Sequence, residues 1–174
     1  MKTPQGVLFT CRLPDTALPE QLEGKRYMVL DGVQDPGNVG TIWRTADAFG
    51  ADGLILLPGC AEPWSPKTLR STMGAAFRLP LWEGSLEGLT ALLDKEGIPL
   101  YATALREDTA DIRDMDLSRA AVVIGSEGKG VSDAVLDASV RTIKIPMTEK
   151  CESLNAASAG TVVLWQMSQG TFPR

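Results

Sequence analysis

Short β-rich runs alternate with helix-length segments along most of this chain, and that alternation restricts the fold more than any other feature. Predicted strands cover Val7–Thr10, Tyr27–Leu30, Gly53–Leu57, Ile98–Thr103, Ala121–Ile124 and Thr142–Ile145, and predicted helices cover Val39–Phe49, Pro66–Ala76, Leu86–Glu96, Ser132–Ala138 and Leu154–Met167. Strands separated by helices of this length form a mostly parallel sheet with helices on both faces. We therefore expect an α/β fold whose ligands bind beyond the carboxyl ends of the strands.

The length of 174 residues suits one compact domain. Residues 1–25 contain Pro4, Pro14 and Pro19 and resemble a linker that contributes one strand, so we expect the folded domain to cover residues 26–174. No apolar run approaches the roughly 20 residues that a membrane span needs. The start of the chain lacks the apolar segment of a signal peptide. The three cysteines have no paired or metal-like spacing, which is typical of free thiols in a reducing cytoplasm.

The sequence contains no histidine, which argues against hydrolytic triads and histidine–zinc sites. The acidic stretch Glu107–Asp116 is interpreted as a solvated loop rather than a metal site. We expect no metal. The formal charge of −5 argues mildly against a nucleic-acid partner. A local basic patch, or a further domain or subunit, could still supply a positive field.

The first segment with unusual residues runs from Asp31 to Ala46. A loop rich in Gly, Pro and Asp follows a strand, and Asn38 is placed to cap the next helix. Arg44 lies opposite the apolar stripe of that helix by simple helical geometry. The residues alone leave two interpretations open, a solvated arginine with a capping asparagine or an arginine directed at a phosphate or ribose.

The second segment runs from Ala121 to Ser132 and has three glycines within six residues after a buried-type strand. Glycines at these positions allow backbone N–H groups to approach a ligand closely. The spacing fits neither a Walker A loop nor G-x-G-x-x-G. A plain strand–turn–helix connection, capped by Ser132, is the alternative. Glu127 is then either solvated or an acceptor for hydrogen bonds from a substrate.

The third segment runs from Ile143 to Thr161. Ser153 is predicted to cap a last helix that is small or apolar nearly all round, so the helix should be central or form a subunit interface. Asn155 in its first turn is unusual, because a buried amide needs hydrogen-bond partners. Packing alone could also explain it.

Together the three segments resemble the motifs of the SpoU (TrmH-like) RNA methyltransferases of the SPOUT superfamily. Asn38-x-Gly40-x-x-x-Arg44-x-Ala46 is similar to motif 1, and Gly125-Ser126-Glu127-x-x-Gly130 is similar to motif 2. Ile145-Pro146-Met147 followed by Ser153-Leu154-Asn155 is similar to motif 3. The match spans residues 27–167. The departures are small: Ser126 replaces asparagine, Ala156 stands where valine is common, and Cys151 lies in a variable lead-in.

The resemblance implies a deep trefoil knot in the C-terminal part and a homodimer through the knot region and the C-terminal helix. It also implies S-adenosylmethionine as cofactor, with S-adenosylhomocysteine as product. By position, the cofactor would contact Ala102, Thr103, Gly125, Ser126, Gly128, Ile145, Met147 and Leu154. The implied partner is structured RNA, and ribosomal RNA is favoured over transfer RNA because the entry segment resembles two-domain ribosomal enzymes. An upstream RNA-binding domain of those relatives is expected to be absent here.

The implied catalytic residues are Arg44, Asn38, Glu127, Ser153 and Asn155. Arg44 matches the arginine proposed in the family to activate the ribose 2′-hydroxyl. A guanidinium is a poor base, because its pKa lies above about 12. We therefore favour Arg44 as a cation that orients a phosphate and stabilises a developing alkoxide. Glu127, Ser153 and Asn155 would hold Arg44 and the ribose by hydrogen bonds.

Two other classes of function remain open from the sequence. A knotted RNA-binding or assembly factor without catalysis would have no need of all five of these residues. A different nucleotide-binding α/β enzyme would need a phosphate loop or an acidic ribose-binding residue after the first strand, and we find no good candidate.

Overall fold

A computed structural model describes residues 10–106, 109–148, 150 and 153–172. Its centre is a sheet of seven strands in the order β3-β2-β1-β6-β4-β7-β5. The strands are β1 (Arg26–Asp31), β2 (Gly53–Leu56), β3 (Leu81–Glu83), β4 (Leu100–Thr103), β5 (Ala110–Asp111), β6 (Ala120–Gly125) and β7 (Arg141–Lys144). Every pairing between these strands is parallel. The expected mostly parallel α/β sheet is therefore confirmed.

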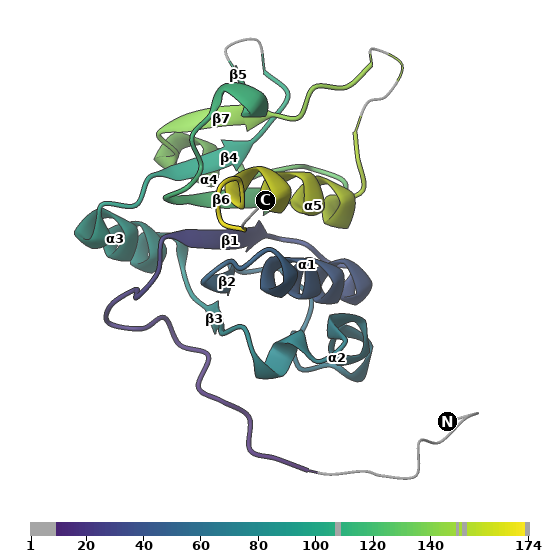
Figure 1. Ribbon diagram of the computed structural model, residues 1–174. Coiled ribbons are helices and arrows are strands. Elements are labelled where there is room, and N and C mark those ends of the chain that lie inside the picture. The colour runs from purple at the N-terminus through teal and green to yellow at the C-terminus, as the bar shows by residue number, and fades with distance from the viewer. Residues whose placement is uncertain (1–9, 107–108, 149, 151–152, 173–174) are drawn as a thin grey trace.

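Helices cover both faces of the sheet (Figure 1). One face carries α1 (Pro36–Ala48), α2 (Pro66–Thr72) and α5 (Ala156–Met167), together with the short 3-10 helices η1 (Ala75–Phe77) and η2 (Ile112–Asp114). The other face carries α3 (Leu86–Glu96) and α4 (Asp133–Ala138). Parallel strands need such crossover connections, and the helices that form them bury both faces of the sheet.

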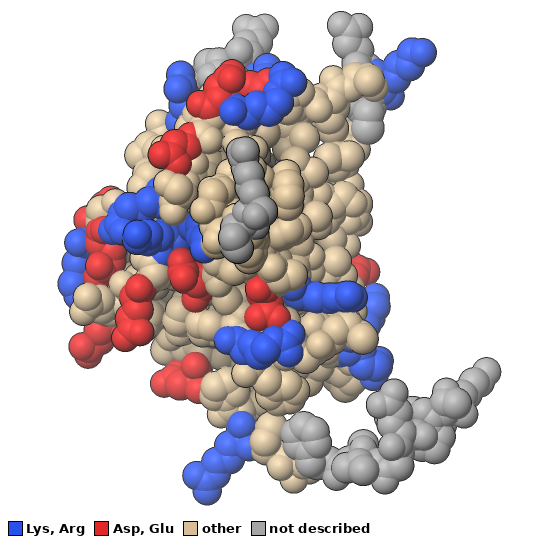
Figure 2. All heavy atoms as spheres, in the orientation of Figure 1, with Lys and Arg blue, Asp and Glu red and all other residues tan. Residues whose placement is uncertain are grey.

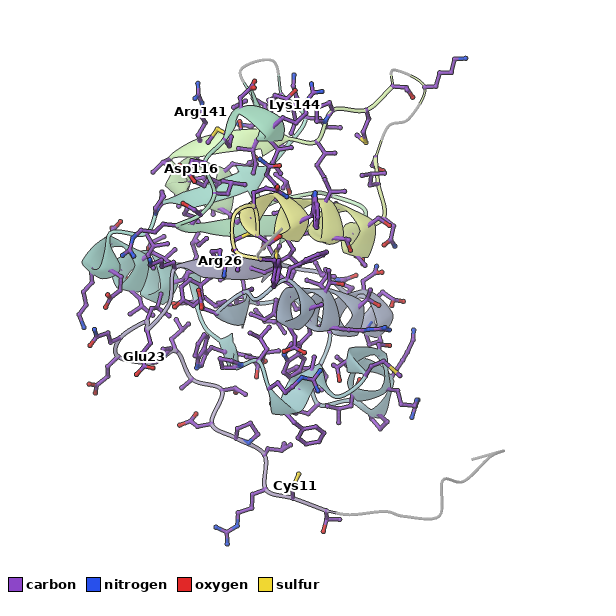
Figure 3. All side chains as sticks on the ribbon, in the orientation of Figure 1. Cys11, Glu23, Arg26, Asp116, Arg141 and Lys144 are labelled. Carbon is purple, nitrogen blue, oxygen red and sulfur yellow. The ribbon has the colours of Figure 1, made fainter. Side chains whose placement is uncertain are left out.

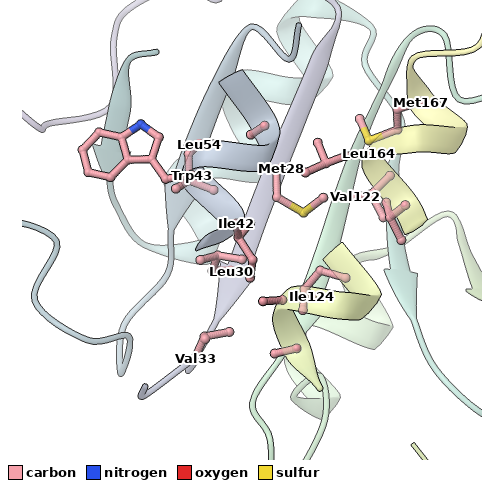
Figure 4. Packing of buried hydrophobic residues seen from close by; sticks show 14 of the residues in the cluster. Met28, Leu30, Val33, Ile42, Trp43, Leu54, Val122, Ile124, Leu164 and Met167 are labelled. Atoms are coloured by element: carbon pink, nitrogen blue, oxygen red, sulfur yellow. The ribbon is translucent and has the colours of Figure 1, made fainter. Parts of the chain in front are cut away.

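Two apolar clusters form because alternate residues of a strand point to opposite faces. In β1, Met28 and Leu30 belong to the cluster under α1 and α5, whereas Tyr27 and Val29 belong to the cluster under α3 and α4. Figure 4 shows the first cluster, in which Trp43 of α1 is fully buried. Each strand of the centre is thus buried on both sides, as its continuous apolar sequence predicts.

The apolar stripe predicted for α1 comprises Val39, Ile42, Trp43, Ala46 and Phe49. The first four are fully buried, which confirms the stripe within the helix, whereas Phe49 is half-buried and caps the C-terminal end. The predicted helix at 66–76 is wrong in its last four residues. Met73 takes a left-handed conformation with φ 49° and Gly74 follows with φ 89°, so the α-helix ends at Thr72.

The sequence also missed two strands. β3 has three residues and β5 has two, too few to show a pattern of alternation. The acidic stretch was interpreted as a loop, yet residues 110–114 form β5 and η2 around the buried Ile112, while residues 107–108 lie outside the described part. Of the predicted strand Val7–Thr10, only Thr10 belongs to the described residues, and it lies in no strand.

Arg26 ties the start of β1 to the end of α5. Its guanidinium donates to the carbonyl oxygen of Gly50 at 2.6 Å and to that of Met167 at 3.4 Å. Figure 3 shows Arg26 beside the ribbons of β1 and α5. α5 is thereby held against the sheet at its C-terminal end, with its first turn directed toward the carboxyl ends of the strands. No helix in the described ranges is long and apolar enough to span a bilayer.

Candidate functional site

A cavity of about 440 Å³ lies beyond the carboxyl ends of β4, β6 and β7. Its walls come from four stretches: the end of β4, the glycine loop after β6, the segment after β7 and the first turn of α5. Residues of these stretches that line it include Thr103, Gly125, Ser126, Glu127, Gly128, Ile145, Met147, Ser153 and Leu154. This volume is in the range of pockets that hold cofactors and drug-sized ligands.

The glycine loop turns tightly because Ser126 and Gly130 exchange backbone hydrogen bonds of 3.0 and 2.9 Å. A Cβ built on Gly125 would lie 2.1 Å from the backbone of Gly130 and of Val131, so only glycine fits at that position. A Cβ on Gly128 would meet nothing within 4 Å. The loop is therefore closed against its own backbone on one side and open on the other, where a ligand can approach.

Asp31 fixes the far end of this loop. It pairs with Gly125 in the β1–β6 register, and its carboxylate accepts a 2.7 Å hydrogen bond from the backbone N–H of Ser132. Ser132 is the N-cap of α4 as predicted, although its side chain makes no capping hydrogen bond. Sequence reasoning did not select Asp31 as a site residue. The available signal was an acidic residue at the carboxyl end of a buried strand.

A chain of three polar side chains lies at the side of the cavity. The amide of Asn155 donates to the side-chain oxygen of Asn38 at 3.1 Å, and the amide of Asn38 donates to the carboxylate of Glu127 at 2.7 Å. The other carboxylate oxygen of Glu127 accepts from the backbone N–H of Gln34 at 3.4 Å. Residues from three distant segments thus converge, as the motif resemblance implies.

The caps of α1 and α5 differ from the sequence prediction. Asp35, not Asn38, caps α1, because its carboxylate accepts from the N–H groups of Gly37 and Asn38 while Pro36 occupies the first helical position. Asn155, not Ser153, caps α5, because its side-chain oxygen accepts from Ala157 and Ser158. Each asparagine amide is left pointing into the site.

Asn155 is exposed rather than buried, so the reason for calling it unusual does not hold. Its polar groups are nonetheless fully used, since the oxygen caps the helix and the nitrogen reaches Asn38.

Glu127 carries a negative charge at neutral pH. Desolvation opposes that charge, but the hydrogen bond donated by Asn38 and the N–H groups around Gln34 outweigh it and lower the pKa of Glu127 below its ordinary value. Cys60 behaves in the opposite way. Burial, opposed in part by N–H groups of Val33 and Gly32, raises the pKa of its thiol to about 11.

Arg44 is exposed on the outer face of α1, as the helical geometry predicts. Within the described ranges it has no hydrogen bond or ion pair, and no hydrogen bond joins it to Glu127 or Asn155. The structure therefore brings together Asn38, Glu127 and Asn155 and leaves Arg44 open to solvent.

Of the eight residues expected to contact a cofactor, seven line the cavity. The exception is Ala102, which is fully buried within β4 and is not part of the lining, because its side chain packs under α3 and α4. No group of three or more potential metal ligands occurs among the residues that the structure describes.

The chain is similar in sequence to known RNA methyltransferases. The model of the SpoU rRNA Methylase family matches residues 25–165. The 23S rRNA (guanosine(2553)-2′-O)-methyltransferase RlmP of Bacillus subtilis is 35% identical over 167 residues, which cover 95% of this chain and 66% of that protein.

Two solved structures have the same fold. The SpoU methyltransferase AviRb of Streptomyces viridochromogenes, in complex with the cofactor AdoMet, superposes with a TM-score of 0.83 at 30% identity, over 91% of this chain and 63% of that one. An AdoMet-bound rRNA methyltransferase of Sinorhizobium meliloti gives a TM-score of 0.82 at 33% identity, over 88% of this chain and 59% of that one. The chain thus spans less than two thirds of the length of these relatives.

Proposed function

The chain belongs to the SpoU rRNA methylase family, and from that premise we propose that it transfers a methyl group from S-adenosylmethionine to a ribose 2′-hydroxyl in structured ribosomal RNA. Three of its relatives carry names that include ribosomal RNA methylation or bound AdoMet. The observation that carries the proposal is the junction of a cofactor-sized cavity with the Asn155–Asn38–Glu127 chain.

The cavity fits this cofactor in size and in lining. Ile145, Met147 and Leu154 supply apolar surface, and the open side of the loop at Gly128 leaves backbone groups accessible. Thr103 is held at the end of β4 by a 2.9 Å hydrogen bond from its hydroxyl to the carbonyl oxygen of Val123. When bound, S-adenosylmethionine supplies an electrophilic methyl group on a positively charged sulfur.

The residues of this chain have to orient the ribose and manage the charge that develops on its oxygen. Glu127 is ionised and exposed, so it can accept a hydrogen bond from a sugar hydroxyl. Asn38 and Asn155 hold that carboxylate in one orientation, because each amide is anchored at a helix end. Well-oriented reactants can account for about 7–11 kcal/mol of a barrier, so positioning is the main contribution here.

Arg44 supplies the positive charge in this proposal. A guanidinium stays protonated at neutral pH, so it can neutralise an RNA phosphate and stabilise the ribose oxygen as it loses its proton. Its exposure on α1 leaves all of its donors available to RNA. Ser153 at the cavity edge would position the same ribose.

We also propose that the protein is a cytoplasmic homodimer with a knotted C-terminal part. Val162, Trp165 and Phe172 are 37%, 56% and 51% exposed on and after α5, and a second copy of the chain would cover these apolar side chains. α5 contacts β1 and β6 of the sheet and also η2, so the segment around η2 packs against it.

The test replaces Arg44 with alanine. We expect calorimetry to show unchanged affinity for S-adenosylmethionine, because Arg44 is not part of the cavity lining. Methyl transfer to ribosomal RNA should fall at least about 100-fold, the usual loss when a charge-stabilising donor is removed. Normal methylation by Arg44→Ala would exclude the assigned role, and a wild-type chain that does not bind the cofactor would exclude the proposed function.

A further inference from the structure

One stretch of the chain differs in charge from the rest of this acidic protein. Between Glu62 and Glu83 the sequence has Lys67, Arg70 and Arg78 and no acidic residue. This stretch forms α2 and η1, which pack beside α1. Figure 2 shows basic side chains over the α1 and α2 side of the molecule.

α1 and α2 lie so close that their outer faces form one surface. A Cβ built on Gly40 of α1 would lie 2.4 Å from the carbonyl oxygen of Thr68 and 2.6 Å from the Cβ of Ser71. Farther along α1, Arg78, which directly follows η1, donates to Asp47 at 2.6 Å. The helices therefore run side by side, with Arg44 between these two contact points and Lys67 and Arg70 on the neighbouring helix.

We call the exposed cations Arg44, Lys67 and Arg70 the basic ridge. Two of three acidic groups near it are paired with cations, and the third accepts a backbone hydrogen bond. Asp35 caps α1 and meets Lys67 at 3.3 Å, while Asp47 is paired with Arg78. The side chain of Glu62 accepts from the N–H of Trp64 at 3.3 Å. Arg44 and Arg70 have no ion pair among the described residues, so two of the three cations of the ridge are open to an anionic partner, and Lys67 is paired only with Asp35.

The ridge is continuous with the candidate site. Lys67 contacts the cap of α1, and Asn38 in the first turn of that helix belongs to the polar chain beside the cavity. The pair between Lys67 and Asp35 is weak, because both side chains are about half exposed, at 60% and 49%. An anionic strand that leaves the site can therefore replace Asp35 at Lys67 with little loss.

We propose that the basic ridge binds the phosphate backbone of the substrate RNA next to the methylated nucleotide. This proposal rests on the proposed function. It adds that the RNA runs from the site over α1 and α2, on the face of the sheet opposite α3. It also accounts for an acidic protein acting on RNA, because phosphate contacts need local rather than overall positive charge.

The test compares two double variants of equal charge. Lys67→Gln with Arg70→Gln neutralises the ridge without removing any residue of the cavity or the polar chain. Lys25→Gln with Lys95→Gln removes two exposed lysines elsewhere on the molecule and serves as the control. Binding of a ribosomal RNA transcript made in vitro is measured by filter binding between roughly 50 and 200 mM salt.

We expect the ridge variant to lose at least about tenfold in RNA affinity at the lowest salt, with a salt dependence shallower by about 1.5 in log–log slope. The control should stay within about twofold of wild type. Both variants should keep the cofactor affinity and the melting temperature of the wild type.

Three outcomes would contradict RNA binding by the basic ridge. They are equal affinity losses in both variants, unchanged affinity in the ridge variant, and a wild-type chain that binds no RNA. These outcomes are separate from failure of the proposed function. The proposed function fails if the wild-type chain does not bind S-adenosylmethionine, and this result does not depend on whether the ridge binds RNA.

Discussion

Asn155 has two functions in the structure that substitutions can separate. Its oxygen caps α5 by accepting from Ala157 and Ser158, and its nitrogen donates to Asn38. Asn155→Ala removes both. Asn155→Asp keeps an acceptor for the cap, and its charge is favourable at a helix N-terminus, but it has no donor for Asn38.

The sizes of the two effects follow from these contacts. Loss of an N-cap costs about 1 kcal/mol, which lowers the melting temperature of a chain of this length by about 2–4 °C. We therefore expect that decrease in Asn155→Ala and a melting temperature within about 1 °C of wild type in Asn155→Asp.

The methyl-transfer activities of the two variants should not follow their melting temperatures. In Asn155→Asp, two acceptors face each other and favour a flip of the Asn38 amide, which turns its oxygen toward Glu127. A hydrogen bond to a charged group contributes about 1.5–3 kcal/mol, so methyl transfer should fall about 10- to 100-fold in Asn155→Asp. Asn155→Ala loses only the neutral hydrogen bond to Asn38, which contributes about 0.5–1.5 kcal/mol, so methyl transfer should fall about 2- to 10-fold. Differential scanning calorimetry and a methyl-transfer assay with labelled cofactor measure the two quantities. Full activity in Asn155→Asp would show that the hydrogen bonds between Asn155, Asn38 and Glu127 do not support methyl transfer. An unchanged melting temperature in Asn155→Ala would show that Asn155 does not stabilise α5 as its N-cap.

Other predictions address the loop, the buried thiol and the carboxylate. Gly125→Ala should raise the dissociation constant of S-adenosylmethionine at least about tenfold and lower the melting temperature, because the added methyl group clashes with the loop backbone, whereas Gly128→Ala should retain the wild-type melting temperature. Cys60, whose pKa is raised to about 11, should be alkylated about 100-fold more slowly at pH 8 than in denatured protein, as followed by peptide mass mapping; equal rates would contradict its burial. Because the pKa of Glu127 is lowered on folding, its contribution to stability is present above its unfolded value of about 4.3 and is lost as the pH falls through the lower folded value. The difference in melting temperature between wild type and Glu127→Gln should therefore stay constant from about pH 7 to 5 and shrink below about pH 4; a difference that grows in acid would reverse the assigned sign.

Some features were accessible from the sequence because they are local or periodic. The stripe of α1 was predicted from helical spacing, and its four central residues are fully buried. The strands of the centre were predicted from continuous apolar runs. The resemblance to three motifs selected Asn38, Glu127 and Asn155 as site residues before any contact between them was visible.

The caps of α1 and α5 were assigned to the wrong residues, for a reason that is physical. Asp35 and Asn38 are both good capping residues, and so are Ser153 and Asn155. Which of two candidates caps a helix depends on where the chain leaves the preceding strand, and two capping residues only two or three positions apart cannot be distinguished by composition. The short strands β3 and β5 were missed for a similar reason, since their pairing partners rather than their own residues define them.

The order of apolar and polar residues along the chain thus determined the α/β class, the main elements and the side of each helix that is buried, because these depend on neighbours within a few residues. Only the tertiary structure decided that Asn155 reaches Asn38 across 117 positions, that Asn38 reaches Glu127 across 89, and that α2 brings Lys67 beside α1. Contacts of that separation are set by how the parallel strands are ordered in the sheet. No local preference of the backbone encodes that order.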